Sequence, residues 1–247
     1  MKLAVITDLH ANREAVQAVL DHADAHGAGG YAFLGDYVGY GADPGWVIDT
    51  VKRYVEQGAI AVGGNHDAGV AEGAAPGMRP EARQVIEWTR GQLGPAQIDF
   101  LTGLPLSRTL GDMLFVHANA YAPAEWEYIE SRAEAVRSLH ATRCHYTFCG
   151  HMHEPKLFHL SGTGKAGDFV PTAGVAIPMP PLRQWLVVPG SAGQPRDGNP
   201  AACYAIFDTT EQALTFHRVP YDHEAAGDKI RRAGLPARLA ERLAHGQ

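Results

Sequence analysis

The first part of the chain alternates between short apolar runs and segments with helical periodicity. The runs that predict buried strands cover residues 3–6, 31–34 and 59–62. Apolar positions spaced as on one helix face predict helices over 12–25 and 44–56. Asn12 suits the N-cap of the first helix, and Pro44 suits the first turn of the second. Strand-then-helix units in succession imply a parallel sheet with right-handed crossovers.

The rest of the chain mixes both patterns. Further helices are predicted over 80–90, 95–101 and 131–140. Strands are predicted over 106–110 and 113–116, which form a hairpin, and over 146–149. After residue 153, strands are predicted over 157–160, 184–188, 202–208 and 213–219. Because Gly- and Pro-rich loops separate these last strands, we expect them to form a second, more antiparallel sheet.

Two segments near the end of the chain complete the pattern. Residues 161–181 are rich in Gly and Pro and show no regular periodicity, so we expect a long loop there. Beyond residue 222, two short amphipathic helices are predicted from apolar positions Ile230, Leu235, Leu239 and Leu243. The whole pattern predicts an α/β fold with two sheets inside and helices outside.

Composition narrows the class of protein. The 247 residues include 27 acidic and 21 basic side chains, 13 histidines and 3 cysteines. This length suits a single domain over 1–247, whose core needs neither metal nor disulfide. An odd number of cysteines without a C-x-x-C motif favours the reducing cytoplasm, and no apolar run approaches the ~18 residues of a membrane span. The net charge of −6 disfavours a broad nucleic-acid surface but leaves anionic substrates open.

Polar clusters follow the predicted strands. Four of them are Asp8-Leu9-His10, Gly35-Asp36, Gly64-Asn65-His66-Asp67 and Gly150-His151-Met152-His153, and His117 follows a fifth strand. Ligands of parallel sheets gather at the carboxyl ends of strands, so we expect these clusters to meet. Asp8 taken alone also suits a helix cap, and no G-x-G-x-x-G motif supports a dinucleotide site.

The clustered side chains have the chemistry of metal ligands. Carboxylate, amide and imidazole donors suit Mn²⁺, Fe or Zn²⁺ better than a thiolate-rich structural zinc site would. The candidates are Asp8, His10, Asp36, Asn65, His117, His151 and His153. A lone metal takes three or four protein ligands, so this set indicates two metals, which clamp a phosphoryl group when roughly 3.5–4 Å apart.

The five blocks resemble, in order, the D-x-H, G-D, G-N-H-D/E, H and G-H-x-H motifs of the calcineurin-like metallophosphoesterase superfamily, over residues 8–153. The resemblance implies a four-layer αββα sandwich of two mixed β-sheets with flanking helices. It implies one metal on Asp8, His10 and His153, a second on Asn65, His117 and His151, and Asp36 as the bridge. It further implies His66 as the general acid and Asp67 as the residue that orients its ring. The implied reaction is in-line hydrolysis of phosphoester or phosphoanhydride bonds by a metal-bridging hydroxide.

A narrower resemblance concerns substrate. Residues 35–41 and 189–196 are similar to the bacterial and archaeal branch of diadenosine tetraphosphatase-like and serine/threonine phosphatase-like proteins. In that branch the Pro-Gly-Ser loop, with Ser191, lies near the metals, and Arg196 is placed to contact a substrate phosphate. A surface ion pair is the alternative for Arg196. Residues 119–128 lack the arginine expected in that branch, so the substrate is open between dinucleoside polyphosphates, phosphoproteins and phosphodiesters.

Several other residues have competing interpretations. Tyr37 and Tyr40 flank the Asp36 loop and are candidates to line the cleft, with packing as the alternative. Trp126 and Tyr128 are candidates to stack on a substrate base, again with packing as the alternative. Cys144 and Cys149 are expected to be small buried apolar residues. The remaining histidines, expected in the core or at the surface, are His22, His26, His140, His145, His159, His217, His223 and His245.

The sequence thus predicts a cytoplasmic enzyme that acts on a small phosphate ester or nucleotide. Two other classes are a non-catalytic metal-binding scaffold with this fold and a metal-dependent nucleotide sensor. Scaffolds of this kind typically lose ligands or the general acid, whereas His66 and all candidate ligands are intact here. The sequence is silent about metal identity and oligomeric state.

Overall fold

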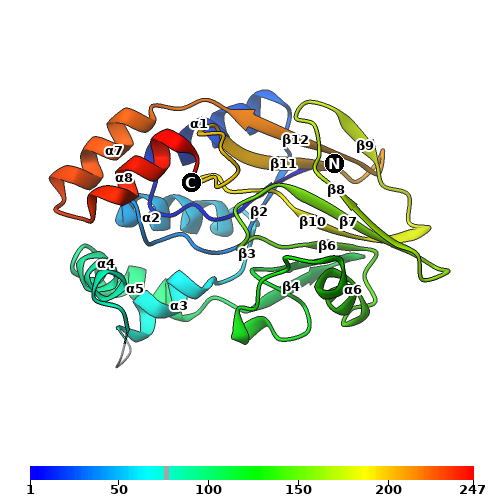
Figure 1. Cartoon of the computed structure of the whole chain (residues 1–247), viewed down its shortest axis with the longest axis horizontal. Helices are drawn as coiled ribbons and strands as arrows, with labels where there is room; N and C mark the ends of the chain where they lie inside the picture. The colour runs from blue at the N-terminus through cyan, green and yellow to red at the C-terminus, as the bar shows by residue number, and fades with distance from the viewer. Residues whose placement is uncertain (75–77) are drawn as a thin grey trace.

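The computed structural model describes residues 1–74 and 78–247, which form two six-stranded sheets packed face to face with helices outside (Figure 1). The strands are β1 (Lys2–Ile6), β2 (Gly30–Phe33), β3 (Ile60–Ala61), β4 (Ser107–Leu110), β5 (Met113–Val116), β6 (Tyr146–Phe148), β7 (Lys156–Ser161), β8 (Ala166–Phe169), β9 (Ala176–Pro178), β10 (Arg183–Val188), β11 (Ala202–Asp208) and β12 (Ala213–Val219). The helices are α1 (Arg13–Ala25), α2 (Pro44–Glu56), α3 (Asn65–Glu72), α4 (Pro80–Gly91), α5 (Pro95–Thr102), the 3₁₀ turn η1 (Pro123–Glu125), α6 (Arg132–His140), α7 (His223–Arg232) and α8 (Ala237–His245).

Both sheets are mixed. The first has the order β3-β2-β1-β11-β12-β9, and the second has the order β4-β5-β6-β10-β7-β8. The predicted parallel arrangement is confirmed for the first three strands, since β1 pairs in parallel with β2, and β2 with β3. The expectation that all strands after residue 153 share the second sheet is wrong. Strand β11 pairs antiparallel with the free edge of β1, so β11, β12 and β9 extend the first sheet.

The predicted loop over 161–181 is also corrected. It contains the short edge strands β8 and β9, which pair antiparallel with β7 and β12. All residues of these two strands are half-buried or exposed. An edge strand therefore needs no apolar alternation, and its pairing is decided by the neighbouring strand.

Alternating side chains of β1 show how the layers form. Leu3 and Val5 point into the apolar core between the sheets, together with Phe148 and Phe207. Ala4 and Ile6 belong to a second core under α1 and α2, and α6 covers the outer face of the second sheet. Alternate positions of a strand face opposite sides, so a strand buried on both faces requires two flanking layers. The four-layer αββα sandwich predicted from the sequence is confirmed.

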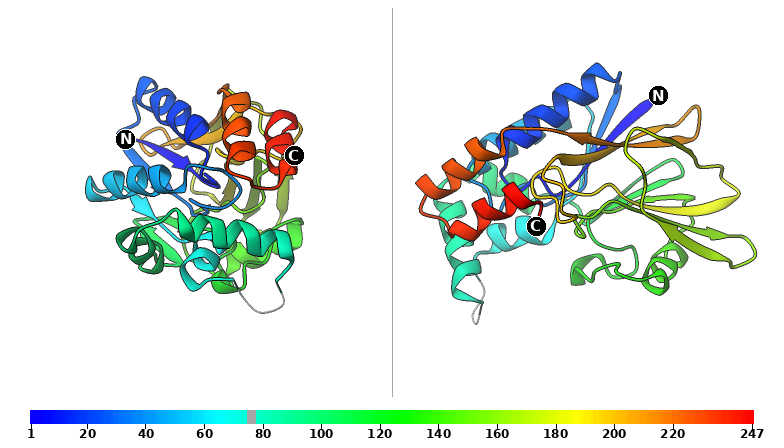
Figure 2. Two further views of the ribbon diagram at one scale, coloured as in Figure 1. Left: turned by 90° about the vertical axis from the view of Figure 1, so that its left-hand side faces the viewer. Right: turned by 45° about the horizontal axis from the view of Figure 1, so that its top comes forward.

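Helices α7 and α8 close one end of the molecule. They lie at the same end as α3, α4 and α5, as the orange and red segments of Figure 2 show. Leu239 and Leu243 of α8 share an apolar cluster with Val85 of α4. Lys229 of α7 adds ion pairs of 2.6 Å each to Glu14 and Asp43. Among the described residues, no helix is both long and apolar enough to cross a membrane.

Candidate metal centre

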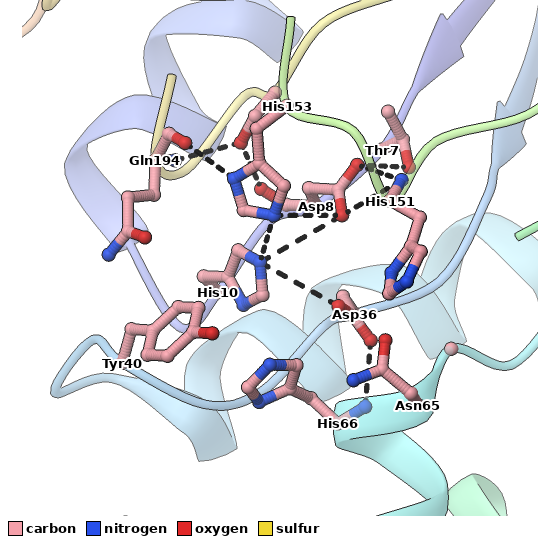
Figure 3. Close-up of polar contacts among 12 residues, drawn as sticks. Thr7, Asp8, His10, Asp36, Tyr40, Asn65, His66, His151, His153 and Gln194 are labelled. Carbon is pink, nitrogen blue, oxygen red and sulfur yellow. Dashed lines mark hydrogen bonds and ion pairs between the residues drawn. The ribbon is translucent and has the colours of Figure 1, made fainter. Parts of the chain in front are cut away.

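The strand ends bring the predicted ligands together in the structure (Figure 3). Their side chains form two groups, and within each group the ligand atoms lie within 4.8 Å of one another. One group is Asp8, His10, Asp36 and His153, and the other is Asp36, His117 and His151. Asp36 belongs to both groups.

Two imidazole rings face each other in the first group. The Nε2 atoms of His10 and His153 are 3.1 Å apart. Both rings donate from Nδ1 to backbone carbonyls, those of Val38 at 3.1 Å and Gln194 at 2.6 Å. With Nδ1 protonated, the two neutral rings direct lone pairs at each other, and a cation between them turns this repulsion into attraction. The donor set therefore fits a metal ion.

The second group is arranged in the same way. His117 donates from Nδ1 to the Leu34 carbonyl at 2.7 Å, which directs its Nε2 into the site. That Nε2 lies 3.2 Å from Asn65 Oδ1, 3.2 Å from His151 Nδ1 and 3.4 Å from Asp36 Oδ2. His151 Nε2 is buried without a partner among the described residues. An amide oxygen thus joins imidazole and carboxylate donors around one point.

Electrostatics make this pocket attractive to cations. Asp8 and Asp36 are almost wholly buried. Burial by itself would raise the pKa of Asp36, but His117 and His66 hold it well below its ordinary value. Burial opposes a charge on His117, yet the adjacent Asp36 carboxylate raises its pKa to about 9. The buried carboxylates therefore favour a positive charge on His117, whereas burial lowers the pKa of His10 and His151.

The backbone around the site is strained. Several candidate ligands have a positive φ, namely Asp8 (53°), His10 (46°), Asp36 (54°), His151 (68°) and His153 (61°). Non-glycine residues adopt this region rarely, and such residues cluster at functional sites because the surrounding structure must hold them there. Gly64 supplies the space, since a Cβ there would overlap Asp36 Oδ1 and its amide nitrogen.

His66 and Asp67 begin α3 but occupy different environments. The His66 amide donates to Asp36 Oδ1 at 2.9 Å, and its ring lies 5.0 Å from that of His10. Among the described residues no hydrogen bond joins the Asp67 carboxylate to the His66 ring, so an orienting role for Asp67 stays a prediction. Asp67 instead accepts from the backbone amides of Asp36 at 2.7 Å, Tyr37 at 2.8 Å and Gly64 at 2.9 Å. It thereby binds the amides of the strained Asp36 loop, whose Asp36 carbonyl accepts from the His10 amide at 2.8 Å.

The structure also places the three candidate substrate residues. Tyr37 is completely buried, and its hydroxyl donates to the Val62 carbonyl at 2.6 Å, so its side chain is not available to a ligand. Ser191 is buried as well and donates to the Asp8 carbonyl at 2.8 Å. Both side chains therefore bind backbone carbonyls and are closed to solvent. Arg196 lies at its margin, where it donates to the Tyr40 hydroxyl at 3.4 Å.

The aromatic residues after His117 lie against ligand rings. Tyr128 stacks on His151 with 4.0 Å between ring centroids, and the Trp126 ring lies 5.8 Å from His117. Tyr128 remains 44% exposed, so one side of this pair faces solvent. Tyr40, a candidate for lining the cleft, lies with its ring 4.5 Å from both His10 and His66.

Sequence reasoning missed the basic residues of the C-terminal helix. Asn65 and His66 line a pocket of about 360 Å³ together with Arg238 and Arg242 of α8. Arg238 pairs with Glu81, whereas no hydrogen-bond or ion-pair partner within the described part of the chain binds the Arg242 guanidinium. Burial, and then Arg196 and Arg238, lower the pKa of Arg242. The four-residue spacing of the two arginines, between the apolar positions of the helix, was the available signal.

Comparison with known proteins agrees with this geometry. A family model described as the calcineurin-like phosphoesterase superfamily domain matches residues 1–212. Buried carboxylate and imidazole groups at the strand ends of a two-sheet sandwich define the class, a metal-binding phosphoester hydrolase. The chain belongs to the calcineurin-like phosphoesterase superfamily.

Individual relatives extend the similarity to the whole chain. An uncharacterized protein of Methanocaldococcus jannaschii is 33% identical over 99% of this chain and 98% of its own. A metallophosphoesterase from Sphaerobacter thermophilus is 35% identical, with a TM-score of 0.88 and coverage of 100% of both chains. A hypothetical protein from Pyrococcus horikoshii OT3 has 19% identity, a TM-score of 0.80 and coverage of 100% of this chain and 98% of its own. This last similarity concerns the fold.

Proposed function

We propose that the centre binds two metal ions and that the protein hydrolyses phosphoester or phosphoanhydride bonds. Asp8, His10 and His153 would bind one ion, and Asn65, His117 and His151 the other, with Asp36 between them. The observation that carries the proposal is the pair of Nε2 lone pairs, 3.1 Å apart, in a pocket that shares Asp36 with a second ligand group. Mn²⁺, Fe and Zn²⁺ all accept these donors.

Each residue around the metal centre has its own role in the proposed reaction. When bound, two such ions supply an activated water and neutralise charge on the phosphoryl group. His66 donates the proton to the leaving oxygen, because its ring has no hydrogen-bond partner within the described residues and faces the pocket. Asp67, through its bonds to the backbone, fixes the position of Asp36. Thr7 donates to Asp8 Oδ2 at 2.8 Å and fixes that carboxylate.

The pocket beside His66 indicates the class of substrate. Arg238 and Arg242 line it, and Arg196 lies next to it, so the side of the site that receives the leaving group is cationic. Guanidinium groups bind phosphates through paired N–H donors. We propose a substrate that carries further phosphates beyond the scissile bond, of which a dinucleoside polyphosphate is the leading example. A phosphoprotein or a simple phosphodiester is the alternative.

A metal-reconstituted substrate panel tests this function. Chelator-treated protein, reloaded with Mn²⁺, would be assayed on bis-p-nitrophenyl phosphate, a phosphopeptide and a diadenosine polyphosphate. We expect hydrolysis that disappears on chelation and in Asp36→Ala, while His140→Ala, which changes an exposed histidine at the end of α6, keeps full activity. Activity that survives chelation or Asp36→Ala would overturn the metal mechanism. Tight nucleotide binding without hydrolysis would identify a sensor, and metal binding alone a scaffold.

A further inference from the structure

Three histidines outside the metal centre meet on the outer face of the first sheet. His22 lies in the last turn of α1, His26 is the C-cap residue one turn later, and His217 lies on the neighbouring strand β12. The ring centroids are 3.9 Å apart for His22 and His26, 5.0 Å for His22 and His217, and 5.1 Å for His26 and His217. One ligand atom from each ring lies within 4.8 Å of the others. From the sequence these residues had no ligand spacing, because β12 is almost two hundred residues away along the chain.

The cluster is separate from the candidate metal centre. Asn12 caps the other end of α1 and binds the Gly193 carbonyl beside that centre at 2.7 Å. Because an α-helix rises 1.5 Å per residue, His22 lies roughly 15 Å along the axis from Asn12. No residue is common to this cluster and to the two ligand groups of the centre.

Hydrogen bonds of His26 and His22 occupy one nitrogen of each ring and leave the other nitrogen available to a metal ion. His26 Nδ1 donates to the His22 carbonyl at 2.8 Å, which leaves the lone pair on Nε2. His22 Nδ1 lies 2.7 Å from the hydroxyl of Tyr204, a residue that also stacks on His217 at 5.2 Å. Metal-ligating histidines almost always engage their second nitrogen in such a bond, because it fixes the tautomer and the ring orientation. Two of the three rings therefore already have the contacts of metal ligands.

The surroundings favour the neutral form of His217 and leave part of the cluster accessible. Burial, followed by the nearby His22 and His26, lowers the pKa of His217 to about 4. His26 is exposed, and with His217 it lines a surface depression of about 460 Å³ that also contains Asp208 and Glu211. Lys2 is the cation at this depression, and its Nζ is bound by the His26 carbonyl at 3.0 Å.

We infer that His22, His26 and His217 form a second metal site that takes a first-row divalent transition ion of the Zn²⁺, Ni²⁺ or Cu²⁺ type. These ions prefer imidazole donors, whereas Mg²⁺ and Ca²⁺ prefer oxygen. Metal–nitrogen bonds of about 2.0–2.1 Å place ligand nitrogens about 3–3.5 Å apart, so modest rotation of the exposed His26 ring closes the site. Water fills the remaining positions around the ion. A bound ion links α1 to β12 and stabilises the folded state.

Nickel binding to untagged, Mn²⁺-loaded protein tests this site. Equilibrium dialysis against Ni²⁺, followed by elemental analysis, would compare wild type with His26→Ala and His217→Ala. His140→Ala serves as the matched control, because it removes an exposed histidine from a helix on the other sheet. We expect wild type and the control to bind one more equivalent of Ni²⁺ than the two variants, or to bind that equivalent at least tenfold more tightly.

Thermal unfolding supplies a second readout. Added Ni²⁺ should raise the Tm of wild type and of His140→Ala more than that of His26→Ala, whose exposed ring can be removed without disturbing the core. Phosphoesterase activity plays no part in either readout, so this site and the catalytic proposal fail independently. Equal Ni²⁺ stoichiometry and affinity in wild type and both variants would overturn the inference. An equal Tm shift in wild type and His26→Ala would do the same.

Discussion

The Asp67 carboxylate binds the backbone amide of Asp36 at 2.7 Å, and this contact joins the first turn of α3 to the loop after β2. The same carboxylate accepts from the amides of Tyr37 and Gly64. Asp36 has a φ of 54°, so its backbone requires support from outside its own loop. A carboxylate in the G-N-H-D motif thus acts through the backbone on Asp36, the residue shared by the two ligand groups.

Replacing Asp67 should therefore damage the site as a whole. Asp67→Asn turns one acceptor into an N–H₂ group that faces backbone donors, and we expect a loss of about 2–4 kcal/mol in the free energy of unfolding. Urea denaturation and metal analysis would measure this loss and an accompanying fall in metal content. The exposed Asp228→Asn is the control. Normal stability and metal content, with only the pH profile of kcat altered, would return Asp67 to a role in orienting His66.

His66 should matter in proportion to the basicity of the leaving group. In His66→Gln we expect kcat to fall about 10²–10⁴-fold for substrates with an alkyl or nucleoside leaving group, since these require protonation. The loss should be much smaller for p-nitrophenyl phosphate, whose leaving group departs as an anion. Steady-state kinetics on both substrates, with metal content measured in parallel, would test this. An equal loss on both substrates would contradict the proton-donor role.

Arg242 should affect binding of long substrates in particular. Its guanidinium lines the pocket beside His66 and has no hydrogen-bond or ion-pair partner within the described residues, so Arg242→Ala should raise KM for a dinucleoside polyphosphate about tenfold. KM and kcat for p-nitrophenyl phosphate should stay unchanged. Arg143→Ala, an exposed arginine before β6, is the matched control. The substrate proposal is rejected if the variant treats both substrates as wild type does.

The ion pairs of Lys229 on α7 should stabilise the folded state in a pH-dependent way. Partial burial opposes its charge, but Asp43 and Glu14 outweigh this and raise its pKa above the ordinary 10.5. A raised pKa means that the stabilisation is complete below pH 10.5 and is lost as the pH rises further. We expect Lys229→Met to lower the free energy of unfolding by about 1 kcal/mol at pH 7, because the pair is partly exposed.

Denaturation curves from pH 7 to 11 would measure this difference. The difference in the free energy of unfolding between wild type and Lys229→Met should become smaller above pH 10.5. Lys165→Met, on an exposed turn, should unfold with the same free energy as wild type at every pH. A difference in the free energy of unfolding that stays constant from pH 7 to 11 would show that the methylene groups of Lys229, rather than its charge, provide the stabilisation.

Much of the local structure followed from local signals. Helices α1 and α2 lie where apolar spacing places them, and Asn12 caps α1 by accepting from the Ala15 amide at 3.2 Å. These features depend on residues within a turn or two of one another, so the sequence contains all the information they need. The predicted ligand clusters also meet as expected, because parallel strands end at the same edge of a sheet.

Other features were decided by contacts between distant segments. Strands β11 and β12 join the first sheet because β1 offers a free edge, which no local pattern reveals. Tyr37 flanks the candidate metal centre along the chain, yet the twist of its loop directs the side chain into the core. Asp67 binds amides some thirty residues earlier in the chain, so its partners could not be assigned from its neighbours.

The histidines show which features followed from local sequence and which depended on contacts between distant segments. The sequence by itself was enough to predict His10, His117, His151 and His153 as candidate ligands, because each follows a strand within a recognisable motif. Only the tertiary structure brought His22 and His26 against His217, because α1 packs across the strand that pairs with β11. Motif and periodicity are properties of neighbouring residues, whereas the packing of a helix on a distant strand depends on the whole fold.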